Sequence, residues 1–268
     1  MSLLGRLRPD SGPERAATRA VMLARAARLP RSGAPTYAAL RRALVTAALG
    51  RLPAEERAWI SRIHARRAEV AAQDAREYAA SAGGGEADEI AGYLASSAEP
   101  WSVPALWGEL MLRLVRELAP GSCLELGTGF GASALYVAAA LELNGSGRLV
   151  TLDREERLRP VASRGFTGLG LADRIEQVTG EIDVTIHGAL AGAAPVDWAL
   201  VDAEHTEAAT VAHFRALRTG LAPHAVVLVD DINLSAGMRR AWEEIRGDDS
   251  VAVALDLHRL GVVVTTSG

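Results

Sequence analysis

Two groups of residues have types and spacing that could do chemistry. The first is LELGTGFGAS at 124–133, where Glu125 precedes three glycines at every second position. The second consists of acids and one histidine in VDAEH at 201–205 and VDDIN at 229–233. Glycines between a strand and a helix let the backbone come close to a nucleotide. Clustered carboxylates beside a histidine can bind a cation or transfer a proton.

The glycine stretch is compatible with two kinds of nucleotide. GTGFGA satisfies the dinucleotide pattern G-x-G-x-x-[GA], which on its own is a weak signal for NAD. Glu125 stands just before the turn, where its carboxylate suits a ligand with an ammonium group better than a pyrophosphate. Asp153 closes the next predicted strand, 22 residues after Gly131, where an acid can accept hydrogen bonds from ribose hydroxyls.

The acids and the histidine of the second group follow two later strands. Ligands of an open parallel sheet bind outside the carboxyl ends of its strands, so this group should lie near the glycine turn. Its members are Asp202, Glu204, His205, Asp230, Asp231 and Asn233. Their oxygen atoms suit Mg²⁺ or Ca²⁺. His205 is the candidate general base, because histidine titrates near neutral pH and the chain contains no lysine.

Alternating strand and helix patterns from residue 104 onward would position both groups. Strand patterns lie at 123–129, 147–153, 174–180, 195–203 and 225–232, and two more lie within 251–266. Helical patterns lie at 106–118, 132–143, 206–221 and 235–247, and a looser one reaches 173. This order predicts an α/β fold, a doubly wound, seven-stranded, mostly parallel sheet with helices on both faces. The last two strands leave no room for a helix between them and should pair antiparallel.

Residues 1–100 are predicted to form a helical extension before a catalytic domain at 101–268. Helical patterns cover 13–29, 36–50, 53–80 and, after the break SAGGGEAD, 89–96. Apolar stripes on these helices have no obvious partner in the sequence. We therefore expect a cap over the catalytic domain or an arm that forms a homodimer.

Composition restricts the partners and the compartment. Cys123 is the single cysteine, which excludes an internal disulfide and fits a reducing cytoplasm. No apolar run reaches the roughly 18–20 residues that span a bilayer, so we expect no membrane partner. Residues 1–80 hold 15 arginines and 7 acids, whereas residues 81–268 hold 14 arginines and 26 acids. The acidic catalytic part would repel phosphates, which argues against nucleic acid.

With these motifs, residues 101–268 resemble the class I S-adenosylmethionine-dependent methyltransferases, and among them the catechol and caffeoyl-coenzyme A O-methyltransferase group. ELGTGFGAS resembles the first motif, LVTLD at 149–153 the second, and VTGEI at 178–182 the segment beside the adenine. The resemblance implies that Asp153 contacts the ribose and that Glu181 lies at the adenine, where an Asp is commoner. The other implied cofactor contacts are Glu125, Gly127, Thr128, Gly129, Phe130, Gly131, Ser133 and Asp202.

The resemblance also implies a reaction, which is methyl transfer from S-adenosylmethionine to a hydroxyl oxygen of a small molecule. In the resembled group, the positions of Asp202, Asp230 and Asp231 bind Mg²⁺, although the last is Asn there. We expect Asp202, His205 and Asp230 to be catalytic, with Mg²⁺ as an optional cofactor. Three alternatives stay open: an NAD(P)-dependent oxidoreductase, a metal-dependent hydroxylase or hydrolase on the same sheet, and a protein that binds the cofactor without turnover.

Overall fold

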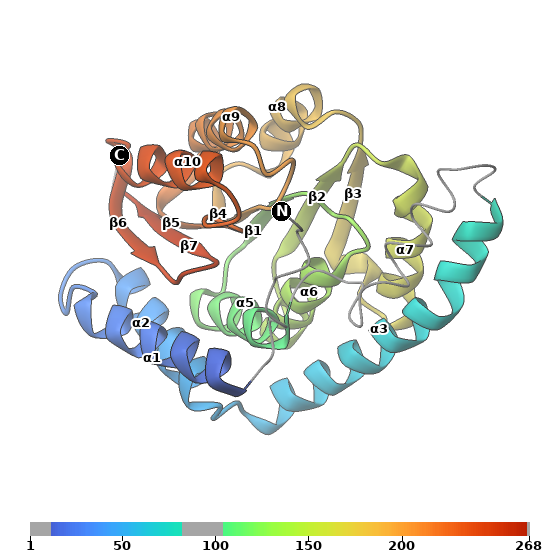
Figure 1. The fold of residues 1–268 in the computed structure, drawn as a ribbon, viewed down its shortest axis with the longest axis horizontal. Helices are drawn as coiled ribbons and strands as arrows, with labels where there is room; N and C mark the ends of the chain where they lie inside the picture. Colours follow the sequence, from blue (N-terminus) through green and yellow to red (C-terminus); the bar gives the residue numbers. More distant parts are fainter. Residues whose placement is uncertain (1–11, 82–103, 267–268) are drawn as a thin grey trace.

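The computed structural model describes residues 12–81 and 104–266, and its centre is a seven-stranded sheet (Figure 1). The strands lie in the order β3-β2-β1-β4-β5-β7-β6. They are β1 (Ser122–Leu126), β2 (Arg148–Asp153), β3 (Ile175–Thr179), β4 (Val196–Val201), β5 (Leu221–Val229), β6 (Val251–Asp256) and β7 (Gly261–Thr265). β1 to β5 pair in parallel, and β7 pairs antiparallel to both β5 and β6. The predicted sheet and its antiparallel final strands are confirmed.

Three helices cover one face of this sheet (Figure 1). They are α8 (Ile182–Ala193), α9 (Glu207–Leu217) and α10 (Ala236–Arg246). The sequence did not predict α8, because β-branched residues and glycines weaken its helical pattern. Ile182, Ile186 and Leu190 recur at four-residue spacing and are buried, so packing on the sheet determines this helix.

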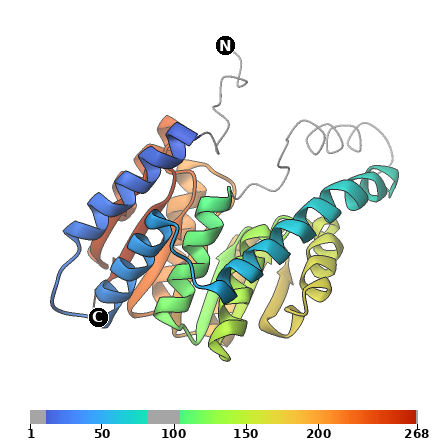
Figure 2. The ribbon, with the colours of Figure 1, turned by 90° about the horizontal axis from the view of Figure 1, so that it is seen from below.

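The opposite face carries a larger helical layer that includes the N-terminal helices (Figures 1 and 2). Its members are α1 (Gly12–Arg28), α2 (Pro35–Leu49), α3 (Ala54–Ser81), α5 (Ala105–Leu118), α6 (Ala132–Asn144) and α7 (Arg159–Gly168). Leu40 and Leu44 of α2 belong to the same buried cluster as Leu110 of α5 and Val262 of β7. The N-terminal helices therefore share a core with the sheet, whereas their role as a cap or a dimerisation arm stays a prediction.

A buried ion pair joins the N-terminal helices to the rest of the domain. Arg113 of α5 donates to Glu56 of α3, and neither side chain exposes more than 8% of its surface. Arg116, one turn further along α5, lies 3.5 Å from the same carboxylate. The helix predicted at 89–96 lies outside the described residues. Within the described ranges, no helix has both the length and the apolar character that crossing a membrane requires.

The strand order determines where a ligand can bind. β1 lies between β2 on one side and β4 on the other, so the connections diverge there and leave a crevice at the carboxyl end of β1. The loops that follow β1, β4 and β5 leave the sheet at this edge. Val229 at the end of β5 pairs with Gly261, which in turn pairs with Asp256 at the end of β6. The turn between β6 and β7 therefore reaches the same edge.

Candidate active site

The glycine turn after β1 packs tightly against the protein at Gly127 and Gly131, whereas Gly129 faces open space. Gly127, Gly129 and Gly131 have φ values of 101°, 50° and 84°, which side chains other than glycine rarely adopt. A Cβ on Gly127 would lie 2.1 Å from the backbone oxygen of Asp202, and one on Gly131 would lie 2.6 Å from the Phe166 ring. No atom of the described residues comes within 4 Å of a Cβ on Gly129. This open position allows a ligand to approach the backbone.

A cavity of about 340 Å³ opens in front of this turn, within the range of small-molecule sites. Its walls come from the loops after β1, β2 and β4 and from the starts of α6 and α8. The predicted site residues in its lining are Gly127, Thr128, Gly129, Phe130, Ser133, Asp153, Asp202, Glu204 and His205. The structure thus brings the glycine turn and the group after β4 to one cavity.

Glu125 lies fully buried in β1, next to the cavity but outside its lining. Its Oε2 accepts a hydrogen bond of 2.6 Å from the Thr151 hydroxyl, whereas its Oε1 has no hydrogen-bond partner among the described residues. Burial raises the pKa of Glu125 to about 8, and the hydroxyls of Ser133 and Thr151 oppose this rise. A buried carboxylate oxygen without a partner can accept a hydrogen bond from the ammonium group of a ligand.

Asp153 ends β2, and backbone groups fix its carboxylate at the cavity wall. Its Oδ2 accepts from the N–H of Gly129 at 2.7 Å, and its Oδ1 accepts from the N–H of Glu155 at 2.8 Å. The first of these bonds ties the carboxylate to the glycine turn. Each oxygen keeps a lone pair for a hydroxyl of a ligand, as the predicted ribose contact requires.

Glu181 does not reach the cavity wall. It is exposed at the residue before α8, and its neighbour Ile182 lines the cavity instead. The contact of Glu181 with an adenine therefore stays a prediction.

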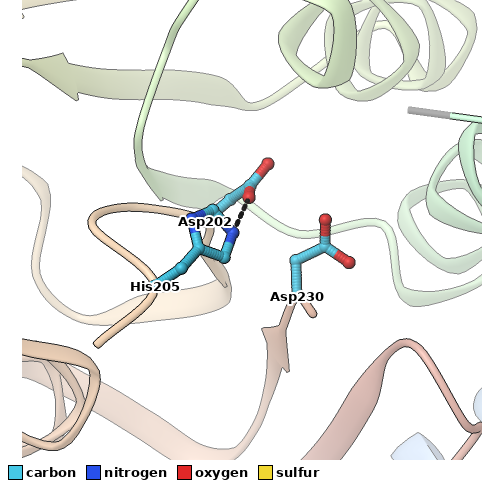
Figure 3. A group of neighbouring side chains, drawn as sticks. All are labelled: Asp202, His205 and Asp230. Atoms are coloured by element: carbon cyan, nitrogen blue, oxygen red, sulfur yellow. Dashed lines mark ion pairs between the residues drawn. The ribbon is translucent and has the colours of Figure 1, made fainter. Parts of the chain in front are cut away.

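Asp202, His205 and Asp230 meet where β4 and β5 end (Figure 3). Ligand atoms from the three side chains lie within 4.8 Å of one another. Nε2 of His205 is 3.2 Å from an oxygen of Asp202 and 3.7 Å from an oxygen of Asp231. The adjacent carboxylate of Asp202 raises the pKa of His205, and burial together with Asp230 raises the pKa of Asp202 to about 7. Asp202 and His205 therefore form an acid–base pair in which the surroundings raise both pKa values.

The loop after β4 bends back sharply so that His205 faces Asp202. Glu204 and His205 have φ values of 60° and 43°, and the N–H of His205 donates to the carbonyl of Ala203 at 2.8 Å. Left-handed backbone at a residue other than glycine costs of order 1–3 kcal/mol and is found mainly at functional sites. Thr206 then caps α9 with its hydroxyl. The strained turn returns the imidazole to the cavity.

Arg259 belongs to this site, although the sequence analysis did not identify it. From the turn between β6 and β7, its Nε and Nη2 donate to the two oxygens of Asp230 at 3.0 and 2.8 Å. Its Nε also lies 3.3 Å from an oxygen of Asp231. The predicted antiparallel pairing of the last two strands could have indicated this contact, because it brings the turn between β6 and β7 to the carboxyl end of β5. Asn233, which was expected in the acidic group, donates instead to the carbonyl of His258 in this turn.

Comparison with known proteins supports a methyltransferase. Residues 124–232 match the model of a methyltransferase domain family. Catechol O-methyltransferase of Niastella koreensis is 33% identical over 104 residues, which are 38% of this chain and 46% of that protein. Human transmembrane O-methyltransferase is 46% identical over 57 residues, which are 21% of this chain and 19% of that protein. The chain thus spans less than half the length of these curated relatives.

Solved structures share the fold over more of the chain. An O-methyltransferase from Bacillus cereus in complex with S-adenosylhomocysteine is 24% identical, with a TM-score of 0.53 over 62% of this chain and 83% of that chain. The O-methyltransferase TomG from Streptomyces achromogenes, in complex with S-adenosylmethionine, is 25% identical, with a TM-score of 0.54 over 65% of this chain and 84% of that chain.

The sheet order, the glycine turn and the acid that ends β2 define a class I S-adenosylmethionine-dependent methyltransferase fold. The match to the methyltransferase domain family and the relatives named above agree with this class. Within it, the domain resembles the catechol O-methyltransferases among these relatives, so the resemblance seen in the sequence is confirmed.

Proposed function

We propose that the protein transfers a methyl group from S-adenosylmethionine to a hydroxyl oxygen of a small molecule. The observation that carries this proposal is one cavity with two chemically different ends. One end has the open glycine turn beside the buried Glu125, and the other has the pair Asp202–His205. The O-methyltransferase names of the relatives support the same reaction class.

The donor end fits S-adenosylmethionine on features of this chain. Oε1 of Glu125 and the Ser133 hydroxyl suit an amino acid moiety, and the carboxylate of Asp153 suits a ribose diol. The NAD(P) alternative places a pyrophosphate at the glycine turn, and a pyrophosphate offers no hydrogen-bond donor to the buried Oε1 of Glu125. The ammonium group of the methyl donor does, which supports S-adenosylmethionine.

The acceptor end fits proton removal from a hydroxyl. S-adenosylmethionine, when bound, supplies an activated methyl group. Because Nε2 of His205 faces Asp202, Nδ1 is the ring nitrogen that takes the proton of the acceptor hydroxyl. Asp202 orients the imidazole and stabilises its protonated form. Alignment of the two ends accounts for most of the rate, and the contact between the Gly127 turn and the Asp202 backbone maintains that alignment.

The sequence predicts Mg²⁺ on Asp202, Asp230 and Asp231, and the described side chains fit this ion poorly. The ligand atoms that lie within 4.8 Å of one another include an imidazole nitrogen of His205. Mg²⁺ prefers six oxygen ligands in near-ideal octahedral geometry. Both oxygens of Asp230 already accept hydrogen bonds from Arg259. No step of the proposed reaction therefore passes through a metal.

Calorimetric titration with S-adenosylhomocysteine and with NADH tests the donor. We expect micromolar binding of S-adenosylhomocysteine and no binding of NADH. Asp153→Asn should weaken the first by about 10- to 100-fold, since a hydrogen bond to a charged group contributes about 1.5–3 kcal/mol. Binding of NADH alone would assign the protein to the oxidoreductases, and binding of neither ligand would refute the proposed donor.

Transfer of a radiolabelled methyl group to a panel of hydroxylated small molecules tests the reaction. His205→Gln should keep the affinity for S-adenosylhomocysteine and lose transfer by about 10²–10⁴-fold, the usual contribution of a general base. Wild-type protein that binds the cofactor and methylates no acceptor would favour the non-catalytic binder. Turnover of an acceptor without the methyl donor would favour the hydroxylase or hydrolase.

We also infer a cytoplasmic homodimer. The inference on location rests on the single buried Cys123, which needs no oxidising compartment. The inference on assembly rests on the N-terminal helices, where Leu23 of α1 and Leu49 of α2 are 38% and 46% exposed. Light scattering should give twice the chain mass of 28.2 kDa. A monomeric mass would remove the dimer.

A further inference from the structure

The acidic residues at the ends of β4 and β5 already have a cationic partner within the chain, which is Arg259. The guanidinium of Arg259 binds both oxygens of Asp230 in a two-point geometry and lies 3.3 Å from Asp231. Asp230 is 5% exposed, so its charge has little contact with water. Bidentate arginine–carboxylate pairs are among the strongest hydrogen-bonded pairs in proteins.

The turn that carries Arg259 is fixed to the loop that carries the acids. The N–H of Ile232, two residues after Asp230, donates to the carbonyl of Arg259 at 2.9 Å. Leu257 and Leu260 are fully buried, and the N–H of the first donates to the carbonyl of the second at 3.0 Å. The guanidinium is therefore a built part of the site and not a mobile surface charge.

We propose that Arg259 is the resident cation of this site and that the site binds no divalent metal ion while Arg259 is present. A metal on Asp230 requires an oxygen at about 2.0–2.6 Å, depending on the ion. Such an ion would lie beside the guanidinium that already holds both oxygens, so it must displace two charge-assisted hydrogen bonds and overcome the repulsion between like charges. The charge that a metal would provide is therefore already present.

This inference gives Arg259 a positioning role in the proposed methyl transfer. It neutralises Asp230 and Asp231, whose carboxylates lie beside Asp202 and His205. The role in the reaction rests on the proposed function, whereas the exclusion of metal does not.

Binding of Mn²⁺ to the full-length protein, followed by electron paramagnetic resonance after removal of bound metal, tests the proposal. Wild-type protein should leave the Mn²⁺ signal unchanged at micromolar concentrations. Arg259→Gln should bind Mn²⁺ at least about tenfold more tightly, because it removes the guanidinium that neutralises Asp230 and Asp231. Arg259→Lys keeps the positive charge and, like the wild type, should not bind Mn²⁺ at micromolar concentrations.

A matched control removes an arginine from an exposed ion pair away from the site. Arg215, near the carboxyl end of α9, donates to Glu244 of α10. Arg215→Gln changes the net charge by the same amount and should leave Mn²⁺ binding at the wild-type level. A gain equal to that of Arg259→Gln would mean that net charge, and not the site, controls the result, and it would overturn the proposal.

Two further outcomes keep the test decisive. Micromolar binding of Mn²⁺ by the wild type that Asp230→Asn abolishes would overturn the proposal, even if Arg259→Gln fails to fold. Titration of the same samples with S-adenosylhomocysteine separates this inference from the proposed function. Wild-type protein that binds neither ligand would refute the methyl donor and still support the exclusion of metal.

Discussion

Glu125 should release a proton when the cofactor binds, and Glu125→Gln should abolish that release. The carboxyl group is fully buried, one of its oxygens has no partner among the described residues, and burial raises its pKa to about 8. At pH 7 such a group is about nine-tenths protonated. A ligand ammonium group beside it favours the ionised form. Binding of S-adenosylhomocysteine at pH 7 should therefore release about 0.9 proton from Glu125.

Calorimetry in buffers with different ionisation enthalpies measures this number directly. Because a proton is released, the association constant of the wild type should rise nearly tenfold per pH unit around pH 7. Well above pH 8, where Glu125 is already ionised, the association constant should no longer depend on this group. The affinity of Glu125→Gln should depend less steeply on pH over this range, because Asp202 is then the remaining cavity carboxylate with a raised pKa. Glu142→Gln, on the exposed side of α6, provides the matched control and should behave like the wild type. Equal proton release from the wild type and Glu125→Gln would refute the reasoning.

Three other predictions concern the acid–base pair, the turn and the core. His205 must be neutral to act as a base, so activity should rise with pH through an apparent pKa above 6.5. In Asp202→Asn this rise in activity should occur at lower pH, because the carboxylate that raises the pKa of His205 is gone. Gly127→Ala should abolish cofactor binding in a calorimetric titration, whereas Gly145→Ala, which meets no described atom within 4 Å, should keep it. Arg113→Met should lower the free energy of unfolding in urea by about 3–5 kcal/mol, because it leaves a buried carboxylate of α3 without its main partner.

The sequence predicted the parts of the molecule that depend on local pattern. Strands of apolar residues alternated with helices, and the parallel order then placed the ends of β1, β4 and β5 at one edge. Asp202 and His205 were therefore expected near the glycine turn, and both line the cavity beside it. Their mutual distance was not predictable, because it depends on two left-handed residues in the loop after β4.

The parts that the sequence did not predict depend on contacts between distant segments. Arg259 reaches Asp230 across 29 positions of the sequence, and no spacing rule links the two. α8 forms because the sheet buries Ile182 and its neighbours, although its local propensity is weak. The predicted boundary at residue 100 assigned the N-terminal helices to a separate extension, whereas α1 and α2 share one buried core with the sheet.

The contact between the glycine turn and the loop after β4 limits how such an enzyme can change over evolution. A Cβ on Gly127 would lie 2.1 Å from the main-chain oxygen of Asp202, so the spacing between the two ends of the cavity is set by main chain against main chain. Substitution of surrounding side chains cannot alter that spacing. A lineage could therefore exchange its acceptor by remodelling rim positions such as Arg154 and Glu204 while the reacting distance is inherited unchanged.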